Sequence, residues 1–422
     1  MKLEILEFLE GRDKVRNNEL NPPKEDIFIK LLGKRLKAFL PKLMQKTDSD
    51  MWIIIGNENH PDPTMPTMLP ESIDLGRLTI VVLCFHSERF ERHIISRVFT
   101  ESNDLFKASF EKGHIDEWDS LRKIVDRCDP KNIMLNYSDS ITLADGLTYT
   151  NYKRLKKRLG KHSKKFKSSE PLALMWLNKR TQEELKIFTS IVKKTEEIIE
   201  NVFKGNSISE MTTEELERDL KQKTDELGMT AWYSKVDFQR KGKKTLFNKG
   251  FIQPGDLIHC DFGIRHLGLS SDIQKLFYLP RTDEKDIPKS FKILLEQACQ
   301  LQDIVSENLS KGFTGDEVLN NALTQMKKKG INGKVYTHPL GYYGHGSVPI
   351  IGRYNQQEKV PVEGNYLVYD NSCWAIELCV IGAVPEWDNQ KVHILVEDSA
   401  ILTNNKVCFI SKRQKTINVL RS

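Results

Sequence analysis

Six residues in the C-terminal part of the chain have the types needed for metal-assisted chemistry. Two aspartates lie in HCDFGIRHLGLSSDIQ, two histidines in THPLGYYGHG, and two glutamates stand inside apolar segments, WAIELCV and HILVEDSAIL. They are Asp261, Asp272, His338, His345, Glu377 and Glu397. Carboxylates and imidazoles form a ligand set that Mn, Fe, Co and Zn accept. Each residue alone is more often structural than functional, so only their meeting in the folded chain would make a site.

The two aspartates lie in a segment whose pattern predicts a β-hairpin. The residues before Asp261 and after Asp272 favour strands, and the tetrapeptide Arg265–Gly268 could form the tight turn. A turn centred between His266 and Leu267 would place the two aspartates directly opposite each other, with Cβ atoms about 5 Å apart. Because like charges there destabilise a sheet, a shared proton, a nearby Arg or Lys, or a bound cation must compensate.

The elements that must position these residues fit a chain of two domains. A length of 422 residues exceeds the size at which a single core stops growing, and 39% hydrophobic with 29% charged residues is typical of a globular protein. The first part reads as α/β: a helical pattern covers 26–43, and 51–56, 78–85 and 132–137 are buried-strand candidates separated by helical stretches. Helical patterns at 181–202, 213–228, 291–311 and 314–329 then alternate with β-rich segments.

A dense basic run at 152–171 separates the two parts and predicts a last helix followed by a linker. A solvated face explains it better than a polyanion site, because no aromatic residues interleave its charges. We therefore do not expect a nucleic-acid partner.

Seven scattered cysteines without a CxxC pair indicate reduced thiols. The apolar run 78–85 is far shorter than the roughly 20 residues of a membrane span, and without a recognisable export signal we expect a cytoplasmic protein.

The six residues also resemble a known family. Asp261, Asp272, His338 in HPLG, Glu377 in AIEL and Glu397 in VEDSAIL resemble, in order and context, the metal ligands of the creatinase, prolidase and methionine aminopeptidase family. The resemblance implies an α/β N-terminal domain at 1–172, followed by an α+β pita-bread metallopeptidase domain at 173–422. Aminopeptidase P, prolidase and creatinase carry such an N-terminal domain and simple methionine aminopeptidases do not, so the resemblance narrows to that subgroup. Within it the similarity is greatest to Xaa-Pro aminopeptidase.

The resemblance implies a dinuclear centre. Asp261 would chelate one metal, His338 and Glu377 would bind the other, and Asp272 and Glu397 would bridge them. Two divalent ions, Mn first with Co, Zn or Fe as alternatives, would lower the pKa of a bridging water and produce a hydroxide nucleophile. The implied partner is a peptide substrate, and relatives of this kind are often homodimers.

Two residues take catalytic roles by the same resemblance. Glu377 would shuttle a proton to the leaving nitrogen, and His345 would hydrogen-bond the substrate or the developing oxyanion. The expected activity is that of an Xaa-Pro aminopeptidase. An Xaa-Pro dipeptidase, a metal-free creatinase-like hydrolase and a non-catalytic binding module on the same fold are the alternatives, and retention of all the ligands argues against the last two.

One position departs from the family pattern. Relatives usually have a further histidine 17 or 18 residues before the first aspartate ligand, where this chain has Lys243 and Lys244. Tyr233 and Asp237 are the nearest alternatives upstream. This departure bears on the substrate more than on metal binding.

Overall fold

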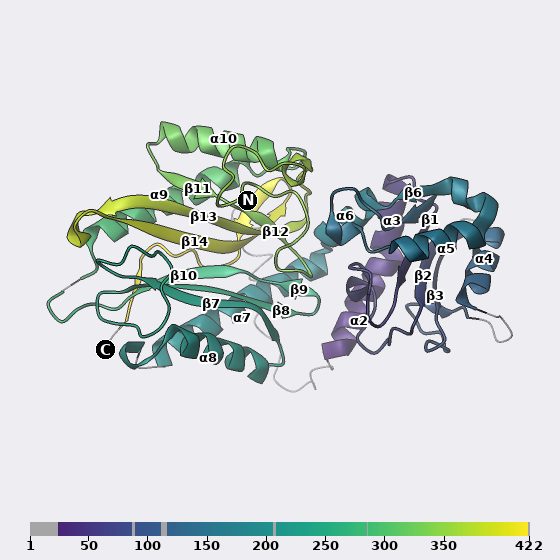
Figure 1. The fold of residues 1–422 in the computed structure, drawn as a ribbon, viewed down its shortest axis with the longest axis horizontal. Coiled ribbons are helices and arrows are strands. Elements are labelled where there is room, and N and C mark those ends of the chain that lie inside the picture. The colour runs from purple at the N-terminus through teal and green to yellow at the C-terminus, as the bar shows by residue number, and fades with distance from the viewer. Residues whose placement is uncertain (1–23, 87–88, 111–115, 206–207, 285, 421–422) are drawn as a thin grey trace.

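The computed structural model describes residues 24–86, 89–110, 116–205, 208–284 and 286–420. The chain forms two sheets, each with its own helices (Figure 1). The helices of the first part are α2 (Lys24–Lys34), which continues through a π-helical segment (Arg35–Phe39) into α3 (Leu40–Lys46), and then α4 (Glu117–Cys128), α5 (Tyr149–Leu159) and α6 (Glu170–Asn178). Its strands are β1 (Met51–Gly56), β2 (Thr79–His86), β3 (Arg89–Ile95), β4 (Lys107–Ala108), β5 (Ile133–Leu135) and β6 (Phe166–Ser168).

The N-terminal sheet is covered by helices on both faces. Its strand order is β4-β3-β2-β1-β5-β6, in which β1 pairs antiparallel with β2 and parallel with β5. Along β1, Trp52 and Ile54 pack in one core with α3 and α6, whereas Met51 and Ile53 pack in another with α4 and α5. Burial on both faces explains the continuous apolar run in this strand. The three predicted strands are confirmed.

Three strands of this sheet, β3, β4 and β6, were not predicted. β3 forms a hairpin with β2, where the sequence pattern indicated helix between strands. The segment expected to be a linker after the basic helix forms β6, which pairs parallel with β5. Because β6 is a three-residue edge strand inside a basic run, it has no alternating apolar pattern to reveal it. The basic helix is α5, and its charges meet acids of α4: Arg158 pairs with Asp116 and lies 3.7 Å from Asp119.

The C-terminal sheet is larger and mostly antiparallel, with the order β11-β13-β14-β10-β8-β7. Its strands are β7 (Thr230–Gln239), β8 (Leu257–His266), β9 (Leu269–Ser270), β10 (Ile273–Tyr278), β11 (Gly333–Val335), β12 (His338–Leu340), β13 (Ser372–Val384), β14 (Gln390–Thr403), β15 (Lys406–Phe409) and β16 (Asn418–Val419). The helices are α7 (Gln182–Gly205), α8 (Thr213–Glu226), α9 (Lys289–Asn308) and α10 (Gly315–Lys328). All four predicted helices of this part are confirmed.

These helices cover the sheet in two pairs. In Figure 1, α9 and α10 lie over the β13–β14 half, and α7 and α8 lie over the β7–β8 half. Capping boxes start two of them, with Thr212 and Glu215 at α8 and Thr314 and Glu317 at α10. Because the helices bury one face of the sheet, side chains that alternate along its strands point to the other face.

The centre of the hairpin turn lies one residue later than predicted, so the strand register differs from the prediction. Asp261 pairs with Gln274, not with Asp272, because the turn is formed by Leu267 and Gly268. Both turn residues have positive φ, 50° and 74°, which is the backbone of a tight two-residue hairpin and suits a glycine. Moving the turn centre by one residue shifts the partner by two, so Asp272 keeps the same face and becomes a diagonal neighbour of Asp261.

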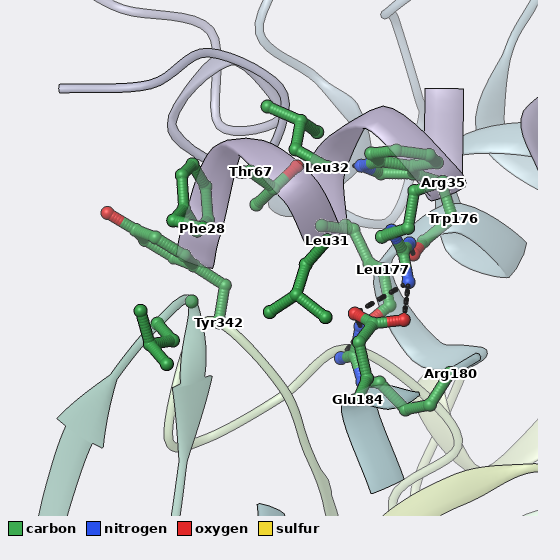
Figure 2. Close-up of a pocket in the computed structure, with 12 residues that line it drawn as sticks. Phe28, Leu31, Leu32, Arg35, Thr67, Trp176, Leu177, Arg180, Glu184 and Tyr342 are labelled. Atoms are coloured by element: carbon green, nitrogen blue, oxygen red, sulfur yellow. Dashed lines mark hydrogen bonds and ion pairs between the residues drawn. The ribbon is translucent and has the colours of Figure 1, made fainter. Parts of the chain in front are cut away.

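A buried ion pair joins the first helical segment to the start of α7 (Figure 2). The Arg35 guanidinium donates to both Glu184 carboxylate oxygens, at 2.9 and 2.7 Å, and lies over the Trp176 ring at 4.0 Å. Glu184 also accepts from the Thr181 backbone N–H at 2.8 Å.

A predicted boundary at 172/173 falls within α6, whose side chains 172–177 pack in the N-terminal core. That exact boundary stays a prediction.

Candidate functional site

Four of the six predicted residues lie on strands that meet on the open face of the C-terminal sheet, and a fifth lies between two of its strands. β8 carries Asp261, β12 starts with His338, and Glu377 on β13 pairs directly with Glu397 on β14. Asp272 lies in the break between β9 and β10. The fold therefore brings together side chains that are up to 136 residues apart in the sequence, from Asp261 to Glu397.

The potential ligand atoms form overlapping groups. Oxygen atoms of Asp261, Asp272 and Glu397 lie within 4.8 Å of one another, as do ligand atoms of His338, Glu377 and Glu397. Asp272 also groups with His338 and His345 at the same separation. Glu397 thus belongs to the group with Asp261 and to the group with Glu377. Asp272 belongs to the group with Asp261 and to the group with the two histidines. These residues could hold one cation, or two that share the carboxylates between them.

His338 presents a lone pair to three carboxylates. Its Nδ1 lies 3.2 Å from the Pro339 carbonyl oxygen, which requires the proton to be on Nδ1 and leaves Nε2 as the acceptor. Nε2 lies 3.6 Å from Glu397, 3.8 Å from Glu377 and 3.9 Å from Asp272. Burial, with a smaller effect of His345, lowers the pKa of His338 to about 3, so its imidazole is neutral. A neutral imidazole nitrogen and carboxylate oxygens attract each other only through a cation or a shared proton.

Several buried ligand atoms have no hydrogen-bond partner among the described residues. They are Asp272 Oδ1, both carboxylate oxygens of Glu397 and His338 Nε2. Desolvation raises the pKa of Asp261 to about 6. Burial and neighbouring carboxylates raise the pKa values of Asp272, Glu377 and Glu397 as well. Orphaned acceptors and mutual repulsion at one point fit a divalent cation, which would satisfy both at once.

The backbone around the ligands is fixed by hydroxyl groups. Thr337 Oγ1 donates to the Glu377 carbonyl at 3.1 Å and accepts from the Glu377 N–H at 3.2 Å. Ser399 makes the same pair of bonds to Asp272, donating at 2.8 Å and accepting at 3.2 Å. Such reciprocal bonds orient the carboxylates before any ligand binds.

Gln274 is a member of the site that the sequence analysis missed. Its amide Nε2 donates to Glu377 at 2.6 Å and lies 3.4 Å from Asp261, so it links carboxylates from opposite sides of the cluster. The side chain is buried, and its Oε1 has no partner among the described residues. Only the corrected hairpin register, which pairs Gln274 with Asp261, could have revealed it.

His345 stands at the edge of the cluster against an aromatic wall. Its ring centroid lies 5.1 Å from that of His338 and 5.3 Å from the Trp232 indole. Trp232 occupies a β-bulge in β7 and donates from Nε1 to the Ser271 carbonyl at 2.8 Å. Gly263 and Gly344 make room for it, since a Cβ at either position would overlap the indole. Sequence reasoning did not identify Trp232, because the bulge sets its direction.

The two lysines that replace the family's upstream histidine, and the two residues considered as its substitutes, lie in different places. Lys243 and Lys244 are exposed in the loop after β7. Tyr233 lies beside the cluster, with its ring centroid 6.4 Å from that of His345, and burial and the carboxylate charges raise its pKa. Asp237 lies further along β7, with a carboxylate oxygen 3.5 Å from His259 Nδ1. Of these four residues, Tyr233 therefore occupies the edge of the site.

A comparison with known proteins gives the family. The model of metallopeptidase family M24 matches residues 186–404. No curated protein sequence matches the chain. Among solved structures, the X-Pro aminopeptidase from Thermotoga maritima MSB8 is 16% identical, with a TM-score of 0.66 over 90% of this chain and 100% of that chain.

Two further solved structures show the same arrangement. The Xaa-Pro dipeptidase from Bacillus anthracis is 15% identical, with a TM-score of 0.62 over 94% of this chain and 100% of its own. The prolidase from Pyrococcus horikoshii OT3 is 15% identical, with a TM-score of 0.59 over 91% and 98%. At these identities the likeness shows a shared fold, an N-terminal domain followed by a pita-bread domain. Because the residues that match the family model, 186–404, make up more than half of the chain, the chain belongs to metallopeptidase family M24 and is a metal-dependent peptidase.

Proposed function

We propose that the protein is an Xaa-Pro aminopeptidase with a dinuclear metal centre. The observation that carries the proposal is the convergence of the His338 Nε2 lone pair on three carboxylates, two of which have orphaned buried oxygens. Asp261 would hold one ion, His338 and Glu377 the other, and Asp272 and Glu397 both. Mn²⁺ is the ion we would test first, since oxygen-rich sites suit it.

The chain's own residues have separable roles in the proposed reaction. Two divalent cations in this cluster would acidify a water molecule and polarise the scissile carbonyl. In the group of His338, Glu377 and Glu397, Glu377 is the more exposed of the two carboxylates, with 17% of its side chain exposed. It can therefore take a proton from water and deliver it to the leaving nitrogen. Glu397, only 1% exposed, is too enclosed for that role and serves as a ligand.

His345 would act on the substrate. It is exposed at the edge of the cluster, where Trp232 limits the movement of its ring. A histidine N–H there can donate to the oxyanion that develops on the scissile carbonyl. Tyr233 would provide a second polar group on the same side, in the place of the histidine that this chain lacks.

Peptide hydrolysis by protein purified without chelator tests the proposal. With added Mn²⁺ we expect release of the N-terminal residue from Ala-Pro-Ala, and no release by protein stripped of metal. Cleavage of Ala-Pro alone would instead favour an Xaa-Pro dipeptidase on the same site. Failure to cleave either peptide with metal bound would contradict the proposed function.

We expect no membrane span to accompany this activity, and among the described helices none has the length and apolarity to cross a bilayer. A homodimer stays a prediction that gel filtration with light scattering would test.

A further inference from the structure

Two of the seven free cysteines lie next to each other in the N-terminal part. Cys84 is buried near the end of β2, and Cys128 is half-buried as the last residue of α4. Their Sγ atoms are 3.5 Å apart, within reach of a thiol hydrogen bond. The two residues are 44 positions apart in the sequence, and the packing of α4 on β2 brings them together. Because no CxxC spacing indicates such a pair, the sequence pattern did not reveal it.

Glu91 on β3 forms a group of three potential metal ligands with the two thiols. Its carboxylate is already engaged, because the Arg127 guanidinium donates to both oxygens and His93 Nε2 lies 2.9 Å from one of them. A cation at this point would have to displace Arg127 against the repulsion of its charge. The group therefore lacks the free third ligand that a zinc site needs, which leaves the two sulfur atoms as its reactive part.

The separation of the two sulfur atoms suits a reversible disulfide. A disulfide bond is about 2.05 Å long, so the two Sγ atoms would have to approach each other by about 1.5 Å. Cys128 is the last residue of α4, so a small movement there leaves the preceding turns of the helix in place. Formation of the bond would join α4 to β2 without a change of fold.

The two thiols have different environments, which gives them different roles. The hydrogen bond from Cys84 lowers the pKa of the Cys128 thiol against the opposing effect of burial, and the charge of Arg127 lowers it further. The same hydrogen bond, together with burial, raises the pKa of Cys84. Because the thiolate is the attacking species in thiol–disulfide exchange, the half-buried Cys128 reacts first and the buried Cys84 resolves the product.

We propose that Cys84 and Cys128 form a redox-active dithiol, a modification site at which a low-molecular-weight disulfide oxidises the pair to a crosslink between β2 and α4. The Cys128 thiolate attacks one sulfur of the small disulfide, whose S–S bond breaks and releases one thiolate. The Cys84 sulfur then attacks Cys128 Sγ in the mixed disulfide, and the second small thiolate leaves with the Cys84 proton. Two protein thiols lose two electrons, and one small disulfide is reduced to two thiols.

The crosslink would act on stability. It would close a loop of 44 residues and restrict the unfolded chain, which stabilises the folded N-terminal part. The pair packs in the core beneath α4 and α5, whereas the candidate metal ligands belong to the C-terminal part. Oxidation should therefore raise the melting temperature and leave metal content unchanged.

The test counts thiols in the full chain before and after oxidation. Reduced protein, freed of reductant, is incubated with oxidised glutathione, and its thiols are titrated after unfolding. We expect wild type to lose two of its seven free thiols. A digest without reductant should then contain one pair of peptides joined through Cys84 and Cys128. Seven retained thiols, or losses at other cysteines without this crosslink, would overturn the proposal.

Two variants separate the roles of the two sulfur atoms. Cys84→Ser should stop at a glutathione adduct on Cys128, because the resolving thiol is missing. Cys128→Ser should keep all its thiols, because the buried Cys84 is left alone. The matched control is Cys408→Ser on β15, which removes a thiol of similar exposure and should still lose two thiols. Loss of two thiols by Cys128→Ser would contradict the assigned pair.

Thermal melting measures the consequence of the crosslink. Oxidised wild type should melt about 5 °C or more above reduced wild type, and dithiothreitol should remove the difference. Cys128→Ser should melt at the same temperature with and without oxidised glutathione, which also shows that the variant folds. A crosslink that forms without a rise in Tm would contradict the stabilising role.

Discussion

Two buried carboxylate sites, one in each part of the molecule, differ in what completes them. In the N-terminal part, Asp62 accepts hydrogen bonds from the Thr64 N–H at 2.8 Å, the Thr64 hydroxyl at 2.6 Å and the Asn136 amide at 2.8 Å. In the C-terminal part, Asp272 and Glu397 keep orphaned oxygens around a neutral imidazole. Burial of a carboxylate is common to both, so burial does not mark function. The missing partners do, because they define a place for a cation.

The same contrast appears between neighbouring residues of β14. Asp398 points to the helix side of the sheet, where Gln302 donates to it at 2.9 Å and Ser411 at 2.7 Å. Glu397 points to the open face and joins the ligand groups. Two adjacent acids in one apolar strand therefore do different jobs, and alternation along the strand decides which.

The largest effect should follow from breaking the cation site. Glu397→Ala removes a carboxylate that belongs to both ligand groups, so we expect loss of bound metal and at least a thousandfold loss of kcat, about 4 kcal/mol of transition-state stabilisation. Asp398→Asn is the matched control and should keep metal and turnover. Mass spectrometry of metal content and peptide hydrolysis check both variants. Retention of metal by Glu397→Ala would contradict its assignment as a shared ligand.

Removal of His345 should separate substrate chemistry from metal binding. His345→Ala deletes a donor at the edge of the cluster, so we expect kcat to fall about a hundredfold while metal content is unchanged. His60→Ala, at an exposed position in the N-terminal part, is the control. If metal content fell along with activity, His345 would be a ligand instead of a substrate-binding group.

The Asp62 site should respond in stability only. Asp62→Ala leaves the Asn136 amide and the Thr64 hydroxyl without their buried acceptor, which should lower the free energy of unfolding by about 1–3 kcal/mol. Denaturant unfolding measures the loss, and metal content should match wild type. A change in metal content without a change in stability would reverse the comparison between the two sites. Asp139→Ala at an exposed position is the control.

The smallest effect is a pH dependence of metal-induced stabilisation. The pKa of Asp261 is raised to about 6 in the folded chain, so the folded state binds this proton more tightly than the unfolded state does. Its contribution to the stability of the metal-free protein is present at low pH and is lost as pH rises from about 4 through 6. Mn²⁺ binds the deprotonated carboxylate, so the increase in Tm on adding Mn²⁺ should be greater at pH 7 than at pH 5. Equal increases would contradict a role for Asp261 as a ligand.

The site residues could be predicted from sequence because acids in apolar strands are conspicuous. Glu377 and Glu397 stood out for this reason, and the structure pairs them across β13 and β14. The predicted pairing of Asp261 with Asp272 was wrong because the turn is centred one residue later than expected. The sequence around the turn allows either centre, and only the positive φ of Leu267 and Gly268 selects one. Gln274 could not be found without that register.

Other features depend on contacts that no local pattern encodes. Trp232 points into the site because of a bulge, and two distant glycines make room for its ring. The short edge strand β6 forms inside a basic run because β5 offers it a parallel partner. The cavity lined by Leu69, Arg265 and Tyr342 exists only because α2 and the proline-rich loop of the N-terminal part meet the β8–β9 hairpin.

Titration of metal-stripped protein with Mn²⁺ tests the central claim most directly. Isothermal calorimetry, with metal content measured after desalting, should give two ions per chain for wild type and for Asp398→Asn, and none retained by Glu397→Ala. The orphaned oxygens and the His338 lone pair would then be explained as ligand atoms. Wild-type protein that binds no Mn²⁺, Co²⁺, Zn²⁺ or Fe²⁺ would contradict the account.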